Sequence, residues 1–320
     1  MPLSFKLHSE LAAEHGGEQR WGYRRIQCGT VEADGIQLSN SNDTADINAE
    51  AIGALHKRSR EAAGQRSSGL PKDLGWVDTE TSPTYAGLGT PENTAQVHPY
   101  HFTTAMAELA KEKGVNIIHG LVTDIERSRE GVKSVTYTEN ISSSSESLPA
   151  SDVVIAAGPW SRSVYPPAPI VSQRAHSVTI RPSKPISGYA VFSEIRLPSD
   201  FGKDRRPKRA HKKVVTPEIY ARPNDEAYAC GDPDQLVPLP KTTANVETDD
   251  ARCQDIVDYV SSISQELRDG EVTTRQACYL PLTVTREGPL IGHTGVKGLL
   301  LAAGHTCWGK PASCHEQSGN

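Results

Sequence analysis

The chain has 320 residues, of which 36% are hydrophobic and 23% charged, and a net charge near −5 at pH 7. This length allows a substantial core in one large domain or two modest ones. The acidic balance argues against a general affinity for nucleic acid or anionic membranes, and no apolar run reaches the length of a transmembrane segment. Six scattered cysteines without a C-x-x-C pair predict free thiols and no metal site. Because residues 1–11 lack the features of a secretory leader, the sequence predicts a cytoplasmic protein.

The first half of the chain predicts helices and short strands in alternation. In chain order, the expected elements are a helix at 3–15, a strand at 21–31, a helix at 102–113, a strand at 115–118, an antiparallel pair at 121–128 and 132–139, and a serine-rich loop at 141–147. Leu3, Leu7 and Leu11 recur at helical spacing. Pro99 is well placed near the start of the second helix, and Gly114 ends it.

The second half predicts more strands. The expected elements are a strand at 153–155, alternating strands at 171–192, a hairpin at 218–230 with its turn at 223–225, a helix at 249–267, and two apolar strands that end at Gly292 and Gly304. The continuous apolar run at 153–155 predicts a strand covered on both faces. The basic segment 203–213 contains no interleaved aromatic residues, which favours a solvated loop over a phosphate or nucleic-acid patch.

The run from Ser151 to Ser161 (SDVVIAAGPWS) carries the most functional information, because a buried strand that enters a glycine turn is typical of a flavin-binding sheet. Residues 298–309 repeat its Ala-Ala-Gly pattern, as expected where neighbouring parallel strands deliver loops to one ligand. Such a sheet normally opens with a strand, G-x-G-x-x-G and a helix, and the sequence contains no such fingerprint. We therefore expect the chain to start inside a fold.

Five motifs in order carry a resemblance to a known family. They are V-x-P at 97–99, G-V-x-I at 114–117, D-V-V-I-A-A-G-P-W-S at 152–161, R-x-x-C-Y-x-P leading to G-P-L-I-G at 275–292, and G-H-T-C-W-G at 304–309. Together they resemble the FAD-dependent oxidoreductases of the D-amino-acid oxidase and glycine oxidase class, and within it a fungal group. The similarity extends from about Leu3 to Gly309. Each motif alone is weak, and their order makes them more specific.

The resemblance implies an α/β fold with an α+β substrate part. We expect an incomplete FAD-binding Rossmann-like domain of the glutathione-reductase type and an antiparallel-sheet substrate domain. Residues 95–165 and 271–309 would form the FAD-binding domain, and residues 166–270 with most of residues 1–94 the substrate domain. The polar, aperiodic residues 310–320 predict a disordered tail.

The resemblance also implies FAD as the cofactor and assigns residues to it. The assigned residues are Val122 at the adenine end, Ala157, Gly158 and Trp160 beside the pyrophosphate and ribitol, and Gly304, His305, Thr306 and Trp308 at the pyrimidine edge of the flavin. The alternative for all of them is packing at strand ends, where glycines and a tryptophan also suit a plain α/β sheet.

In this class a C–N bond is oxidised by hydride transfer to the flavin, which oxygen or another acceptor then reoxidises. The cofactor carries the reaction, so no catalytic carboxylate or histidine is strictly required. The implied substrate is a small amine or amino acid, and a substrate carboxylate would need a bidentate arginine. The candidate residues at the substrate are Arg222, Arg275, Tyr220, Tyr279 and His305, with ordinary ion pairs and packing as the alternative. Cys278 lies in a stretch similar to that of the flavinylated cysteine of sarcosine oxidases, with a buried free thiol as the alternative.

Two departures from the family pattern bear on activity. The glycine fingerprint is missing, and the family's glycine-containing turn and helix after G-H-x-x-W-G are replaced by residues 310–320. Three interpretations remain: a truncated FAD-dependent oxidoreductase, a non-enzymatic binding or trafficking protein on a degenerate flavoprotein fold, and a nicotinamide enzyme on a related sheet. We adopt the first and expect this chain to bind FAD weakly or not at all. The sequence identifies no protein partner.

Overall fold

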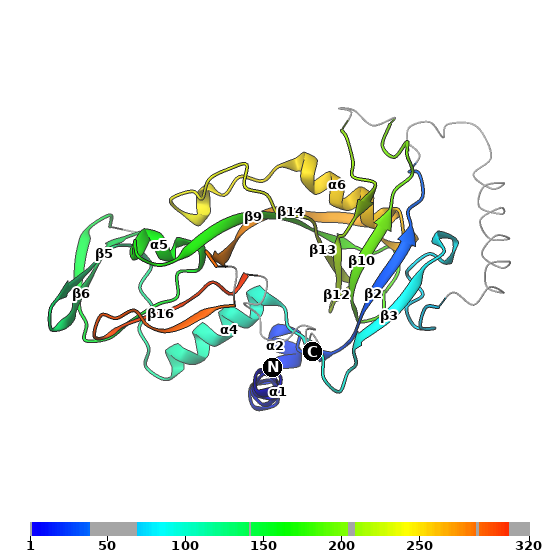
Figure 1. Ribbon diagram of the computed structural model, residues 1–320. Coiled ribbons are helices and arrows are strands. Elements are labelled where there is room, and N and C mark those ends of the chain that lie inside the picture. The colour runs from blue at the N-terminus through cyan, green and yellow to red at the C-terminus, as the bar shows by residue number, and fades with distance from the viewer. Residues whose placement is uncertain (1, 39–68, 141, 204–208, 286–287, 307–320) are drawn as a thin grey trace.

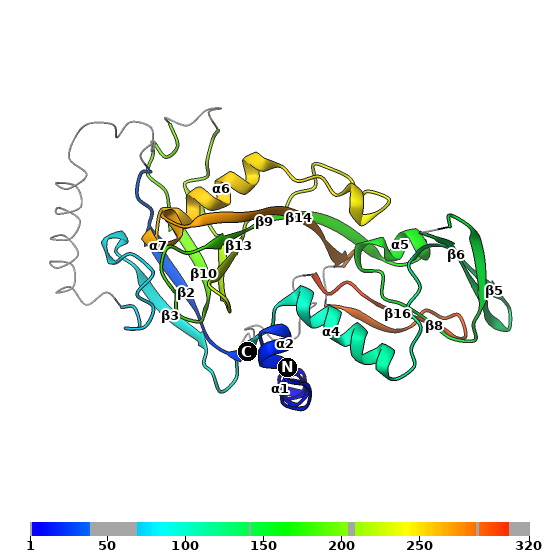
Figure 2. The same ribbon diagram turned by 180° about the vertical axis from the view of Figure 1, so that it is seen from behind.

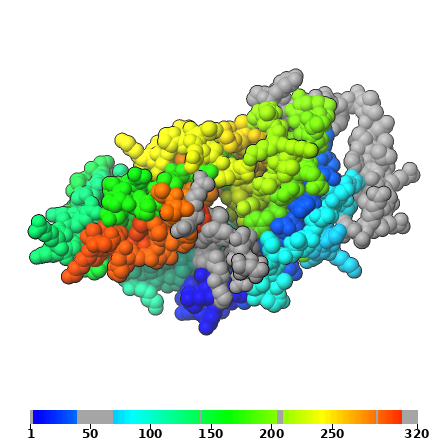
Figure 3. Space-filling model, viewed as in Figure 1, coloured from blue at the N-terminus to red at the C-terminus, as the bar shows by residue number. Residues whose placement is uncertain are grey.

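The computed structural model describes residues 2–38, 69–140, 142–203, 209–285 and 288–306, and it shows a mixed α/β fold (Figure 1). Trp308 and the expected tail at 310–320 therefore lie outside the described residues. Figure 3 shows two masses, with the segment around α6, in yellow, extending along the top from one to the other. None of the described helices is both long and apolar enough to cross a membrane.

The larger mass is built on an eight-stranded sheet with the order β14-β9-β13-β12-β10-β2-β3, and β11 pairs with β10. Its strands are β2 (Gln27–Asp34), β3 (Thr84–Gly89), β9 (Ile170–Arg181), β10 (Tyr189–Arg196), β11 (Val214–Val215), β12 (Glu218–Arg222), β13 (Glu226–Cys230) and β14 (Glu271–Thr283). All neighbours are antiparallel except β2 and β10. The predicted hairpin is confirmed as β12–β13, with Asn224 and Asp225 at φ 64° and 53° in its turn.

Helices α6 (Asp250–Ser261) and α7 (Gln265–Arg268) cover one face of this sheet. Their apolar side chains share a core with Val178 of β9 and Ile219 of β12. The single helix predicted at 249–267 is wrong, because the chain breaks after Ser261. The hydroxyl of Ser264 accepts a hydrogen bond from the Leu267 N–H at 3.3 Å and caps a second helix.

The smaller mass contains two three-stranded sheets around a second core. One has the order β15-β16-β8, formed by Leu290–His293, Leu299–Ala303 and Val153–Ile155. The other is a meander of β5 (Gly120–Ser128), β6 (Gly131–Glu139) and β7 (Ser145–Pro149), so the expected pair is confirmed and the loop expected at 141–147 is partly a third strand. Strands β8 and β16 run parallel, with Leu301 opposite Ile155.

Two expectations about strands in this part of the chain are wrong. Strand β8 has one neighbour, β16, among the described residues. Val154 is 60% exposed, so the strand is not covered on both faces. Residues 115–118 form no strand, and Val115 and Ile118 are exposed. The physical reason is the same in both cases, because a parallel strand is stabilised by neighbours on its edges and by helices on its faces.

Three helices form a third, separate core: α1 (Pro2–His15), α2 (Gly17–Trp21) and α4 (Pro99–Glu112). Trp21 is fully buried there and contacts Phe102 edge to face. The helix expected at 102–113 is confirmed as α4, which starts three residues earlier, at Pro99, and is followed by Gly114 at φ 89°. The remaining elements are short: β1 (Arg24–Arg25), β4 (Ala95–Gln96), α5 (Ser161–Val164) and the 3₁₀ helices η1 (Thr79–Thr81), η2 (Gly158–Trp160) and η3 (Thr243–Asn245).

The cysteines of the described residues are of two kinds. Cys230, Cys253 and Cys278 carry thiols. Cys28 of β2 is disulfide-bonded, so the prediction of free thiols is wrong at that position.

The core between α7 and the sheet gives a stability prediction. Leu267 is 2% exposed, and Leu267→Ala should lower the free energy of unfolding by about 2–5 kcal/mol, because the cavity left behind is only partly refilled. Leu88→Ala, at a leucine that is 46% exposed, is the matched control and should change it by less than about 0.5 kcal/mol. Urea unfolding followed by circular dichroism measures both, and equal losses would contradict this description of the core.

Candidate functional site

Two loops meet at one edge of the small sheet, because β8 and β16 are parallel neighbours and both loops follow their C-terminal ends. The first contains Ala157 and the 3₁₀ turn η2, and the second contains Gly304 and His305. The structure therefore places Ala157, Gly158 and Trp160 at the same edge as Gly304, His305 and Thr306, which are the described members of the two groups assigned to a cofactor. Ligands bind at this edge in open α/β sheets, beyond the carboxyl ends of the strands.

Glycines in the two loops differ in what surrounds them. Gly158 has φ 52°, and a Cβ added there would meet no atom within 4 Å, so its backbone borders open space that suits a cofactor. Gly304 has φ 81°, and its Cβ would lie 2.6 Å from Cγ2 of Thr283. The Gly158 position fits close approach of another molecule, whereas packing against Thr283 is sufficient to explain glycine at 304.

The other residues assigned to the cofactor lie around this edge. Trp160 donates a hydrogen bond from Nε1 to the Pro240 carbonyl at 2.7 Å, so packing accounts for its indole. Val122 of β5 packs against the core shared with β8 and β16, next to an irregularity in the β5–β6 register. His305 and Thr306 are half-buried, and Thr306 has φ 50°.

The candidate substrate residues are divided between the two faces of the large sheet. In Figures 1 and 2, the paired strands β9 and β14 lie between α6 on one side and β16 on the other. Arg275 faces α6, where its Nη2 donates to Oε1 of Gln254 at 2.6 Å. Tyr279 shares that face by alternation along β14, and its hydroxyl donates to the carbonyls of Val237 and Pro238.

The face of the large sheet away from α6 carries Tyr220, Arg222 and Cys278. This follows from the alternation of side chains along β12. Ile219 packs in the core under α6 and Ala221 is buried, so Tyr220 and Arg222, which alternate with them, point to the other face. The structure therefore does not bring Arg222 and Arg275 together at one substrate. Alternation along each strand shows which of its residues share a face. It does not show which faces of β12 and β14 coincide, because that depends on the register between strands, which the sequence did not predict.

Arg222 sits in a polar cluster that the sequence analysis missed in part. Its Nη1 contacts Oε1 of Glu226 at 2.7 Å, and its guanidinium carbon lies 4.3 Å from the ring centroid of Tyr228. The hydroxyl of Tyr220 donates to Oε2 of Glu218 at 2.7 Å. Burial, and then the Glu218 carboxylate, raises the pKa of Tyr220 and of the neighbouring Cys230 thiol, so both remain protonated near neutral pH. The residues missed here are Glu218, Glu226, Tyr228 and Cys230, all from one hairpin.

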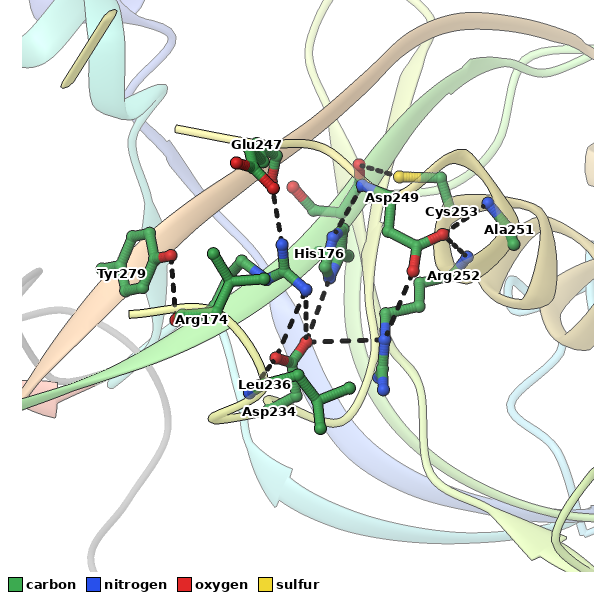
Figure 4. A network of polar contacts seen from close by, with 12 residues as sticks. Arg174, His176, Asp234, Leu236, Glu247, Asp249, Ala251, Arg252, Cys253 and Tyr279 are labelled. Carbon is green, nitrogen blue, oxygen red and sulfur yellow. Dashed lines mark hydrogen bonds and ion pairs between the residues drawn. The ribbon is translucent and has the colours of Figure 1, made fainter. Parts of the chain in front are cut away.

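A second polar network lies on the α6 face and was also missed (Figure 4). Arg174 and Asp234 are joined by two backbone hydrogen bonds, and Nη2 of Arg174 lies 3.4 Å from Oδ1 of Asp234. Both side chains are buried, and Arg252 of α6 contacts the same carboxylate. The two partners are 60 residues apart in the sequence, and no local sequence motif predicts a contact over that distance.

The sequence profile of the family "FAD dependent oxidoreductase" (DAO) matches residues 3–314, so the chain belongs to this family. Two fungal proteins named "Putative oxidoreductase" are similar to it. TDA3 of Saccharomyces cerevisiae is 29% identical, with 97% of this chain and 77% of TDA3 covered. The relative from Schizosaccharomyces pombe is 31% identical, with 96% and 72% covered.

Solved structures share the fold at low sequence identity. Glycine oxidase from Bacillus cereus superposes with a TM-score of 0.65 at 17% identity, covering 97% of this chain and 75% of that structure. L-Proline dehydrogenase from P. horikoshii superposes with a TM-score of 0.61 at 15% identity, covering 95% and 72%. The predicted family and the flavoenzyme fold with a Rossmann-like FAD-binding part are thereby confirmed.

The two loop glycines should respond differently to alanine. Gly158→Ala should lower the free energy of unfolding by about 1–2 kcal/mol, because only its left-handed backbone is strained. Gly304→Ala adds a clash with Thr283, which should lower the free energy by a further 1–3 kcal/mol, approximately. Urea unfolding of both variants tests this, and a greater loss at Gly158 would show that the space beside it is filled by the chain itself.

Proposed function

We propose that the chain supplies the catalytic fold of an FAD-dependent oxidoreductase that oxidises a C–N bond of a small amine or amino acid. One observation carries the proposal: in a member of this family, the loops after β8 and β16 converge at one strand edge, with open space beside Gly158. The names of the structural neighbours, glycine oxidase and L-proline dehydrogenase, support amine or amino-acid substrates. The bound flavin would supply the acceptor for the hydride.

The chain's own residues would bind and orient. In this proposal residues 95–165 and 271–309 hold the cofactor, with the Gly158 and Gly304–Thr306 loops nearest to it. Residues 166–270 and most of 1–94 shape the substrate side. Arg222 is the better candidate for a substrate carboxylate, because it lies on the sheet face away from α6 whereas Arg275 is engaged with α6. A bidentate arginine fixes both the position and the orientation of a carboxylate.

We further propose that residues 1–320 alone bind FAD weakly or not at all. The support is the open edge of β8, which has one partner strand among the described residues and exposes Val154. Val115 and Ile118, beyond α4, are exposed as well. A strand with its G-x-G-x-x-G turn and helix, placed beside β8, would pair with that edge and bring helix N–H groups to the pyrophosphate.

The visible absorbance spectrum tests this proposal. We expect the purified chain to show little flavin absorbance with added FAD. The same chain extended at its start by a strand, a G-x-G-x-x-G turn and a helix should retain a flavin band through gel filtration. A band kept by the short chain would overturn the weak-binding proposal. Stable, monodisperse protein without flavin in either form would favour the alternative, a non-enzymatic binding protein.

Gly158→Ala in the extended form separates cofactor contact from folding. We expect it to lower FAD affinity at least tenfold, approximately, because the new methyl group enters the open space beside the loop. Gly114→Ala is the control, since its φ of 89° is also left-handed and its Cβ also meets open space, but it lies outside both loops. Flavin fluorescence titration measures both, and equal affinities would remove Gly158 from the cofactor site.

Arginine variants of the extended, FAD-loaded form test the substrate side. Arg222→Gln should lower kcat/KM for an amino-acid substrate by more than about tenfold, mainly through KM, because a charged hydrogen bond is lost. Arg275→Gln should change KM for the same substrate by less than about twofold relative to the unsubstituted form. Oxygen consumption or dye reduction with glycine and L-proline provides the assay, and the reverse ranking would exchange their roles.

A further inference from the structure

A short strap, residues 236–240, leaves the large sheet beside Tyr279, as Figure 4 shows. It follows Asp234, which exchanges two backbone hydrogen bonds with Arg174 of β9, at 2.8 and 2.6 Å. The Asp234 carboxylate also accepts a hydrogen bond from the Leu236 N–H at 2.9 Å. The strap therefore begins at a point that is fixed to the sheet.

Tyr279 of β14 holds the middle of the strap. It is 6% exposed, and its hydroxyl lies 3.2 Å from the carbonyl oxygen of Val237 and 3.0 Å from that of Pro238, so the two carbonyls share one donor. Burial raises the pKa of Tyr279, and the hydroxyl therefore keeps the proton that it donates. Loss of this hydroxyl would release both carbonyls at once.

Trp160 is bound to the far end of the strap. Its Nε1 donates a hydrogen bond to the Pro240 carbonyl at 2.7 Å. Trp160 and Gly158 belong to the same 3₁₀ turn, η2, and the hydroxyl of Ser161, which is fully buried, donates to the Gly158 carbonyl at 2.8 Å. Because this turn is fixed internally, a shift of the indole would move the backbone at Gly158 with it.

The strap is stiff between its two attachments. Pro238 and Pro240 hold their own φ near about −65°, and Val237 and Leu239, which precede them, are restricted to extended conformations. In an extended polyproline conformation, the carbonyls of Pro238 and Pro240 are roughly 6 Å apart along the chain. A displacement at the Tyr279 end is therefore passed on to the Trp160 end.

We propose that Tyr279 is a positioning residue for the cofactor, because through the strap it fixes the Trp160 turn and with it the backbone at Gly158. This inference rests on the proposed function, which places the Gly158 loop nearest to the cofactor. A loop that is ordered before binding costs less free energy to order on binding, so the strap raises the affinity for FAD. Tyr279 acts in this way from the α6 face of the large sheet, a different role from the substrate contact predicted from the sequence.

Hydrogen exchange of the Trp160 indole N–H tests the strap in the 320-residue chain without cofactor. Trp160→Phe assigns its signal in ¹H–¹⁵N spectra. We expect Tyr279→Phe to speed this exchange about three- to tenfold, because one hydrogen bond that holds the strap is lost. Phenylalanine keeps the ring, so the direct packing of η2 against β14 is retained. Tyr259→Phe is the matched control, since its hydroxyl is bonded to Nδ1 of His211 at 3.0 Å, away from the strap.

The buried indoles of Trp21 and Trp76 serve as internal references in the same spectra. A variant that only lowers the stability of the whole chain would speed exchange at all three indoles, whereas loss of the strap should act at Trp160 alone. Unchanged exchange at Trp160 in Tyr279→Phe, or equal acceleration at all three indoles, would overturn the proposal.

The extended form with the G-x-G-x-x-G unit tests the role in cofactor binding. Tyr279→Phe should weaken FAD binding about three- to tenfold in a flavin fluorescence titration, and Tyr259→Phe should change it by less than about twofold. Trp160→Phe should resemble Tyr279→Phe, and the double variant should lose little more than either single one, because both break the same connection.

The outcomes separate the strap from the proposed function. Additive losses in the double variant would overturn action through the strap. Faster exchange at Trp160 with unchanged FAD affinity in Tyr279→Phe would confirm the strap and overturn its role for the cofactor. An extended form that binds no FAD would overturn the proposed function and this role with it, whereas the exchange measurement would still decide whether Tyr279 holds the Trp160 turn.

Discussion

The antiparallel pairing of β9 and β14 is the interaction on which the rest of the structure depends. Its register runs without a break from Thr274 to Thr283 on β14, and it is the longest ladder in the described chain. Ile170, at one end of β9, packs in the core of the smaller mass, whereas Val178 and Ile180 pack under α6 in the larger one. The two cores are therefore coupled through one pair of strands, and Thr283 at its end packs against Gly304 of the β16 loop.

The alternation of side chains along β9 and β14 places the polar residues of the large sheet on two separate faces. Alternate residues of β9 and β14 point to α6 or away from it, so neighbours such as His176 and Ser177 belong to different environments. The face toward α6 carries the buried charges. The other face carries the Tyr220–Arg222 cluster. Proximity in sequence is consequently a poor guide to shared function in this chain.

Turn residues and helix-start residues in the sequence predicted the elements that are fixed mainly by contacts between residues close in the sequence. The β12–β13 hairpin, with Asn224 and Asp225 in its turn, and α4, with Pro99 at its start, form where expected. The parallel contact of β8 and β16 followed from their repeated glycine pattern, because both strands end in similar loops. Expectations failed where the outcome depends on distant partners, as at 115–118 and at Val154, and the buried pair of Arg174 and Asp234 was not predicted at all. Such contacts are set by tertiary packing, which periodicity along the chain does not contain.

The short contact between β8 and β16 also limits how tightly a cofactor could be held. Three residue pairs align these strands, from Leu299 and Val153 to Leu301 and Ile155. Beyond this pairing, the Trp160 hydrogen bond to Pro240 holds the first loop, and packing against Thr283 holds the second at Gly304. A ligand that binds both loops must order them, and the free energy of that ordering is subtracted from the affinity. A further strand on the open edge of β8 would fix the loops before binding, so affinity for FAD and stability of this sheet should rise together.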